Sequence, residues 1–183
     1  MTGTLSIQEL KHGLTTAASS LVQFCSTLSA EQFFHQPEGK WSAAQQVQHL
    51  VKSTDMARLA FTLPKFIVRI LGGKPNRHSH SFDELVAKYN LKLEKGGKAS
   101  GRYIPKPIPE TFGQEKLLQQ FSRSMQQFAN ALQKNWTEPK LDQYLAPHPL
   151  LGKITLRELC YFTIHHSNHH LNSIQKMNPT PNS

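Results

Sequence analysis

The sequence predicts an all-α protein, a four-helix bundle with a long insertion between its second and third helices. Four long segments place apolar side chains at intervals of three and four residues, which is the spacing of one helix face. Three of these segments begin with the residue pair of a capping box, and none shows the alternation of a convincing β-strand. Amphipathic helices bury their apolar faces against one another, so the 183 residues are expected to form a single bundle domain, 1–183.

The first helix is predicted from Ser6 to Leu28. Its apolar positions recur with helical spacing at Ile7, Leu10, Leu14, Ala17, Ala18, Leu21, Phe24 and Leu28. A cap at Ser29 then predicts a short helical turn over Glu31–Phe34, and the run HQPEGK breaks the helix before Trp41.

The second helix is predicted to begin at Ser42, where Gln45 completes a capping box. Its apolar stripe consists of Val47, Leu50, Val51 and Thr54. His49 is offset from this stripe, so periodicity predicts a surface position for it. Pro64 either kinks or ends the helix, and a separate short piece over Lys65–Leu71 is one expectation.

Residues 72–110 are the predicted insertion, with two glycine-rich runs, a proline-rich run and one helix over Phe82–Leu93. Two interpretations remain open for so long a connection. It is either a crossover that joins two helices and covers one end of the bundle, or a substrate lid.

The third helix is predicted to begin with a capping box of Thr111 and Gln114 and to run to about Asn135. Pro139–Lys153 is expected to be a loop. The fourth helix is predicted from Thr155 to Met177, and Thr155 with Glu158 has the spacing of another capping box.

Four histidines lie within six consecutive residues of this last helix, as two pairs with i,i+4 spacing. The face of His166 and His170 is mostly apolar, so these two should point to the core. The face of His165 and His169 is mostly polar, so these two should lie at the rim or in solvent.

Two imidazoles on a buried helix face need polar partners. A divalent metal ion would satisfy His166 and His170 together, since i,i+4 spacing lets two ring nitrogens converge on one ion. The alternative is a pair of core histidines that bond to neighbouring helices or to water. A third ligand elsewhere in the chain would decide between the two.

The net charge of +9 is compatible with nucleic acid or a membrane surface as a partner. The basic residues are spread out, however, and the densest group, over Lys88–Lys106, belongs to no nucleic-acid-binding motif. We therefore expect no nucleic-acid and no membrane partner, and a basic surface over an anionic small-molecule site accounts for the charge as well.

A cytoplasmic location is expected, because the start of the chain lacks the features of a signal peptide and the most hydrophobic window, Phe66–Leu71, is too short to span a membrane. Cys25 and Cys160 are expected to be free, buried thiols. A homodimer is compatible with such a bundle.

Three motifs resemble those of the DinB/YfiT superfamily, in the same order and across nearly the whole chain. Trp41-Ser42 followed by His49-Leu50 resembles its W…HL signature. The run HPLLGKITLREL, from His148 to Leu159, resembles its HP…G…TLREL approach to the last helix, and HHLNSI resembles the end of its HxxxH…I element.

The resemblance implies a twisted four-helix bundle with a divalent metal ion, typically nickel or zinc, at one end. Its site takes one histidine from the second helix and two from the fourth, with open positions that hold water. Carried over to this chain, the ligands are His49, His166 and His170. Periodicity selects the last two independently, and the resemblance overrides the surface position of His49.

Relatives include thiol-dependent S-transferases, isomerases and metal-dependent hydrolases. The resemblance thus implies a hydrolase or low-molecular-weight-thiol S-transferase, whose metal ion activates water or a thiol against a small-molecule substrate. The catalytic residues are unassigned, because no carboxylate in a helix core is an obvious base; the nearby polar residues are Tyr161, His165, Asn168 and His169. The alternative is a non-enzymatic metal- or ligand-binding bundle of the stress-response type.

The chain also departs from better-understood members of the superfamily. Its insertion is long, and Asn172 replaces a glycine that is common after the final histidine pair. The particular thiol and electrophile therefore do not transfer to this protein.

Overall fold

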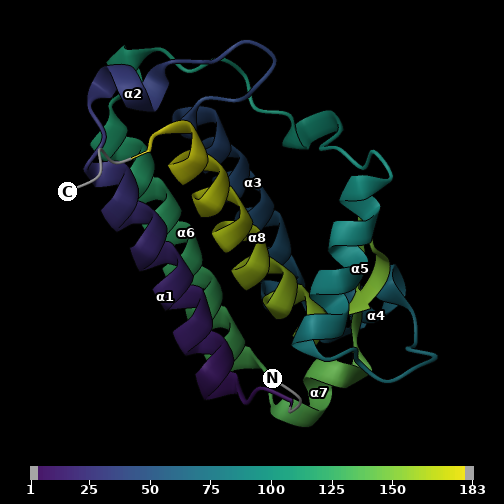
Figure 1. Ribbon diagram of the computed structural model, residues 1–183. Helices are drawn as coiled ribbons and strands as arrows, with labels where there is room; N and C mark the ends of the chain where they lie inside the picture. Colours follow the sequence, from purple (N-terminus) through teal and green to yellow (C-terminus); the bar gives the residue numbers. More distant parts are fainter. Residues whose placement is uncertain (1–3, 180–183) are drawn as a thin grey trace.

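Four long helices lie side by side in a computed structural model that describes residues 4–179 (Figure 1). They are α1 (Ile7–Ser26), α3 (Ala43–Thr62), α6 (Gln114–Asn135) and α8 (Leu156–Met177). Helices α1 and α3 each pack against both α6 and α8, so the four enclose one core. The predicted helical fold is confirmed.

The core of the bundle is built from apolar side chains at the predicted spacing. Leu14 and Leu21 of α1 and Phe121 and Phe128 of α6 are fully buried. Burial of each such side chain stabilises the fold by about 1.5–3 kcal/mol. Both cysteines, Cys25 and Cys160, are buried and free, as expected.

Three of the predicted caps are confirmed. Capping boxes at Ser42 and Thr155 open α3 and α8, and another at Ser29 opens the short helix α2 (Ala30–Phe34). A capping box of Ser6 and Glu9, which was not predicted, opens α1. Helix α4 (Lys65–Gly72) follows Pro64, so the expectation of a separate short piece is confirmed.

The capping box predicted for the third long helix is wrong. Thr111 lies in a 3-10 turn, η2 (Glu110–Phe112), and Gly113 is the N-cap of α6, with a φ of +88° that favours glycine. The Gln114 amide instead donates to the backbone carbonyls of Cys25 and Leu28, at 2.6 and 3.2 Å. These carbonyls belong to the last turn of α1 and to the residues just after it, so a tertiary contact replaces the local one.

The insertion contains α5 (Phe82–Glu94), close to the predicted helix, and a 3-10 turn, η1 (Gly101–Tyr103). Helix α5 packs against α8, and η1 packs against α3. In Figure 1, α5 stands beside α8 on the side away from α1. The insertion thus covers one side of the bundle, where the candidate site lies.

The loop predicted over Pro139–Lys153 is also wrong. The segment contains a helix, α7 (Glu138–Gln143), and an antiparallel hairpin of β1 (Leu145–His148) with β2 (Gly152–Thr155). The strands have four residues each, too few to show a period, and α4 packs against β1 to stabilise them. Within the described residues, no helix is long and apolar enough to cross a membrane.

Candidate metal centre

Two long helices bring three histidines together: His49 from α3, and His166 with His170 from α8. Their exposed fractions are 5, 5 and 8%. The core-facing position predicted for the α8 pair is confirmed, whereas the surface position that periodicity predicted for His49 is wrong. The edge of α3 that carries His49 is covered by the insertion, whose Tyr103 contacts the His49 ring.

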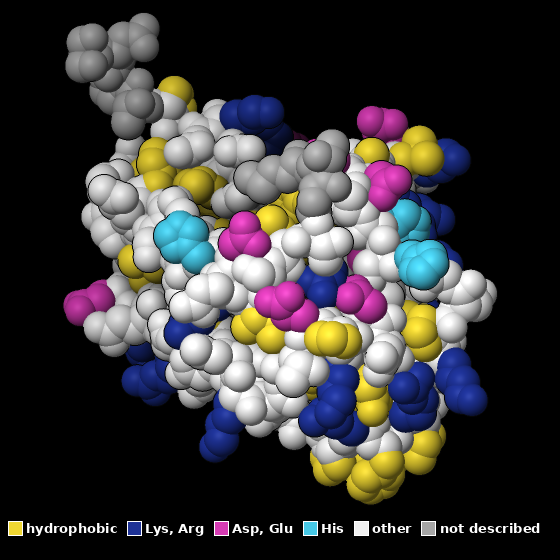
Figure 2. All heavy atoms as spheres, turned by 90° about the horizontal axis from the view of Figure 1, so that it is seen from below, with side chains coloured by type: hydrophobic (Ala, Val, Ile, Leu, Met, Phe, Trp, Pro, Cys, Tyr) yellow, Lys and Arg dark blue, Asp and Glu magenta, His cyan; other side chains and the backbone are white. Residues whose placement is uncertain are grey.

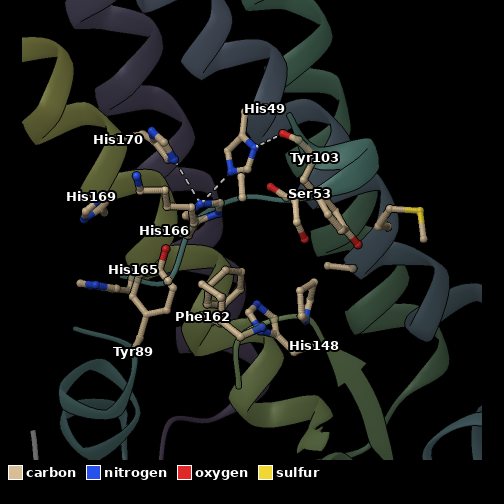
Figure 3. Close-up of a pocket in the computed structure, with 18 of the residues that line it drawn as sticks. His49, Ser53, Tyr89, Tyr103, His148, Phe162, His165, His166, His169 and His170 are labelled. Atoms are coloured by element: carbon tan, nitrogen blue, oxygen red, sulfur yellow. Dashed lines mark hydrogen bonds between the residues drawn. The ribbon is translucent and has the colours of Figure 1, made fainter. Parts of the chain in front are cut away.

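The ring nitrogens of the three histidines converge (Figure 3). The Nε2 atom of His166 lies 3.1 Å from Nε2 of His49 and 3.1 Å from Nε2 of His170. One nitrogen of each ring lies within 4.8 Å of those of the other two. Three imidazoles thus present the same kind of atom to one point.

The outer nitrogens of two of these rings fix their tautomers. His49 Nδ1 lies 2.7 Å from the backbone carbonyl oxygen of Tyr103, and His170 Nδ1 lies 2.9 Å from Oε1 of Gln46. Because an oxygen acceptor faces each Nδ1, each Nδ1 carries the proton. The Nε2 atoms of His49 and His170 therefore direct lone pairs at His166.

This arrangement is short of protons. His166 Nε2 carries at most one proton and donates it to only one of the two lone pairs that face it. Burial lowers the pKa of His166 and His170 well below the ordinary histidine value and lowers that of His49, and the neighbouring histidines add to the effect. Uncharged rings with converging lone pairs are the donor set that a divalent cation requires.

Aromatic side chains hold the three rings in place. Phe162 stacks on His166 with a centroid distance of 4.8 Å, and Trp41 lies 5.1 Å from His49. Tyr89 of α5 forms a T-shaped pair with His166, with a centroid distance of 6.2 Å, and burial raises the Tyr89 pKa to about 12. These contacts limit the rotation of the rings and exclude water from one side of the group.

The histidine group lies on the wall of a cavity of about 1600 Å³. The wall is mostly apolar and includes α3, α4, the hairpin and much of the insertion. Four lysines also line it, Lys40, Lys98, Lys153 and Lys176, and among the described residues of the wall there is no Asp or Glu. The cavity thus suits a neutral or anionic small molecule that is largely apolar.

The other polar residues considered from the sequence fall into two groups. His165 and His169 are half-buried and line the cavity, at the predicted rim. Asn168 is exposed, and the buried Tyr161 accepts a hydrogen bond from the N–H of Leu5 at 3.1 Å, away from the cavity.

Sequence reasoning missed three partners of the site: Gln46, the Tyr103 carbonyl and His148. Gln46 precedes His49 by one helical turn, a spacing that could have placed both on one face. The Tyr103 carbonyl has no sequence signal, because every residue carries one. His148 lines the cavity from the end of β1.

Fold and site together define a helical protein with a buried three-histidine group that could hold a divalent metal ion. The chain belongs to the DinB superfamily, whose family model matches residues 14–174. A search of curated proteins finds no match. Membership of this superfamily and the histidine group fit a metal-binding enzyme.

Proposed function

We propose that this protein is a metal-dependent enzyme of the hydrolase or low-molecular-weight-thiol S-transferase type. His49, His166 and His170 are its ligands for a divalent ion, nickel or zinc. Such an ion, when bound with open coordination positions, lowers the pKa of water or a thiol and supplies a nucleophile at neutral pH.

The observation that carries this proposal is the proton shortage of the three converging Nε2 atoms. A hydrogen-bonded core histidine pair would leave a donor for each buried lone pair, and here at least one lone pair has none within the described group. The rings are also held for ligation in advance, because Tyr103 and Gln46 accept their outer N–H groups.

The cavity wall supports a small-molecule substrate. The lysines favour an anionic or neutral molecule, and the apolar wall excludes water from the reacting group. A low-molecular-weight thiol is the co-substrate of the transferase version, and water takes its place in the hydrolase version.

One observation favours a second candidate, a non-enzymatic ligand-binding bundle. The described residues of the cavity wall include no carboxylate that could act as a general base, so proton transfer would fall to the rim histidines His165 and His169. In this version the protein binds its ligand without turnover.

The first test is the metal content of protein purified without a nickel column. The wild type should carry about one ion per chain, and His166→Ala should lose it, because two imidazoles bind a divalent ion far more weakly than three. His165→Ala is the matched control, since it removes a neighbouring rim histidine of the same helix and should keep the ion. Metal-free wild type that gains no thermal stability on addition of zinc or nickel would overturn the proposal.

The second test separates the enzyme from the binding bundle. The metal-loaded wild type is assayed for hydrolysis of ester and amide panels and for transfer of a panel of low-molecular-weight thiols to electrophiles. Turnover that disappears in His166→Ala and persists in His12→Ala, a change at an exposed histidine of α1 outside the cavity, supports the enzyme. Saturable ligand binding without turnover supports the binding bundle.

A further inference from the structure

We propose that His148 is a substrate-binding residue, whose Nε2–H is a fixed donor to an oxygen acceptor, a carbonyl or carboxylate, on a largely apolar substrate. The inference rests on the proposed function, because it describes the substrate of that same site. It concerns binding, however, and can be tested without metal.

His148 lies one aromatic ring away from the candidate metal centre. Its ring meets Phe162 edge-on at a centroid distance of 4.2 Å, and Phe162 in turn stacks on His166 at 4.8 Å. Figure 3 shows Phe162 between His148 and the three-histidine group. One small molecule could therefore reach from His148 to the three histidines.

The turn after β1 fixes the tautomer of His148. The backbone N–H groups of Leu150 and Leu151 both donate to His148 Nδ1, at 3.2 and 3.1 Å. Gly152 closes this turn with a φ of +74°, a conformation that other residues rarely adopt. An atom that accepts two N–H groups carries no proton, so the proton of the neutral ring is on Nε2.

The ring is also neutral at physiological pH, since burial lowers the His148 pKa to about 4. His148 is therefore a hydrogen-bond donor throughout the neutral range and contributes no general base. Its role differs from that of the three-histidine group, whose Nε2 lone pairs point inward.

The Nε2–H of His148 has no acceptor within the described part of the chain. His148 Nε2 is not one of the fully buried nitrogen and oxygen atoms that lack a partner, so it keeps some accessible surface. The His148 side chain lines the cavity. Two backbone N–H groups orient the His148 ring. The acceptor for its Nε2–H must therefore be water or a bound molecule.

The surroundings define the rest of the ligand. Apolar side chains form much of the wall of the same cavity, among them Met56, Ala60, Leu63, Val68, Leu93 and Leu159. Lys153 of β2 lines the same cavity and adds a positive charge to its wall. An apolar body with one oxygen acceptor satisfies both the wall and the donor, and a carboxylate gains further from the lysine.

The test uses metal-free wild type with octanoate and octanamide as probes. In ¹⁵N-labelled protein, the His148 ring should show the Nε2–H tautomer, and both probes should shift this Nε2–H resonance. Tighter binding of octanoate would assign the acceptor to a carboxylate, and equal binding would assign it to a carbonyl; both results support the proposal.

The decisive variant is His148→Asn. Its Oδ1 replaces Nδ1 as the acceptor for Leu150 and Leu151, so the turn is kept, whereas the donor at the Nε2 position is lost. Probe affinity should fall about five- to tenfold, the effect of one lost hydrogen bond. His148→Gln offers an N–H near the Nε2 position and should recover part of the affinity. His12→Ala, at an exposed position of α1 outside the cavity, should leave the affinity unchanged.

Three results would overturn the inference: an Nδ1–H tautomer, no binding of either probe by the wild type, or wild-type affinity in a folded His148→Asn variant. Failure of the proposed function looks different. If the protein binds no metal ion but binds octanoate through His148, the role of His148 as a donor is supported and the proposed metalloenzyme is contradicted.

Discussion

At the scale of single residues, Gln46 connects the two helices that supply the histidines. It belongs to α3, and its Oε1 accepts the Nδ1–H of His170 on α8 at 2.9 Å. Its amide nitrogen lies 3.4 Å from the carbonyl oxygen of Trp41, which determines the orientation of the amide. One buried side chain thus sets the tautomer of a candidate ligand.

We predict that Gln46→Leu lowers zinc affinity about 10- to 100-fold, because His170 loses the acceptor that holds its Nε2 lone pair toward the site. Competition with a chromogenic chelator measures the change. Gln48→Leu is the matched control on the same helix, since the buried Oε1 of Gln48 has no protein partner among the described residues. Equal zinc affinities of the two variants would contradict this role of Gln46.

At the scale of elements, Glu158 fastens the insertion to α8. Its carboxylate accepts two hydrogen bonds from Arg77, at 2.7 and 3.0 Å, and one from the backbone N–H of His80 at 2.8 Å, and it contacts the His80 ring. It also caps α8 through the N–H of Thr155. These donors outweigh the effect of burial and lower the Glu158 pKa to about 2.

Glu158→Gln should lower the free energy of unfolding by about 1.5–3 kcal/mol, since it replaces a buried carboxylate that accepts charge-assisted hydrogen bonds from the partly exposed Arg77. Urea unfolding measures the difference. Glu84→Gln is the control: Glu84 caps α5 in the same way but is exposed, and glutamine can also fill this position of a capping box, so its replacement should cost much less. Similar costs for the two variants would show that the contacts with Arg77 and His80 add nothing beyond a helix cap.

The contribution of Glu158 also has its own pH window. Its folded-state pKa is about 2, below the ordinary value of 4.5. A carboxyl with a lowered pKa contributes its full stability above pH 4.5 and loses it as the pH falls toward 2. The fastening of the insertion is therefore complete at neutral pH.

At the scale of the whole molecule, the buried histidines determine the response to acid. Burial lowers the pKa values of His49, His148, His166 and His170 from 6.5. Above pH 6.5 these rings are neutral in both the folded and unfolded states. Below pH 6.5, these histidines bind protons in the unfolded chain but not in the folded chain, so unfolding is favoured.

We predict that the free energy of unfolding of the metal-free protein falls as the pH drops from 6.5 toward 4, the pKa of His148 in the folded protein. Each such histidine contributes about 1.4 kcal/mol per pH unit within its window. Urea unfolding across this range measures the slope. His166→Ala should have a shallower slope by one such contribution, and a pH-independent stability of the wild type would contradict the prediction.

Local sequence patterns determined the long helices and the two histidines that α8 contributes to the site. Periodicity and caps depend on neighbours within four residues, so α1, α3 and α8 begin close to where they were predicted. The inward position of His166 and His170 follows from the same rule, because both lie on the apolar stripe of one helix.

Only the tertiary structure decided the rest. His49 is buried because Tyr103, 54 positions away in the chain, covers it. The periodicity of α3 depends on α3 alone and cannot show which distant segment covers that helix. The start of α6 depends on carbonyls at the end of α1 that bind Gln114. The position of His148 beside the site needs the hairpin to bring β1 against Phe162 of α8. Each of these features depends on segments that meet only when the chain folds, and a pattern within one segment cannot contain them.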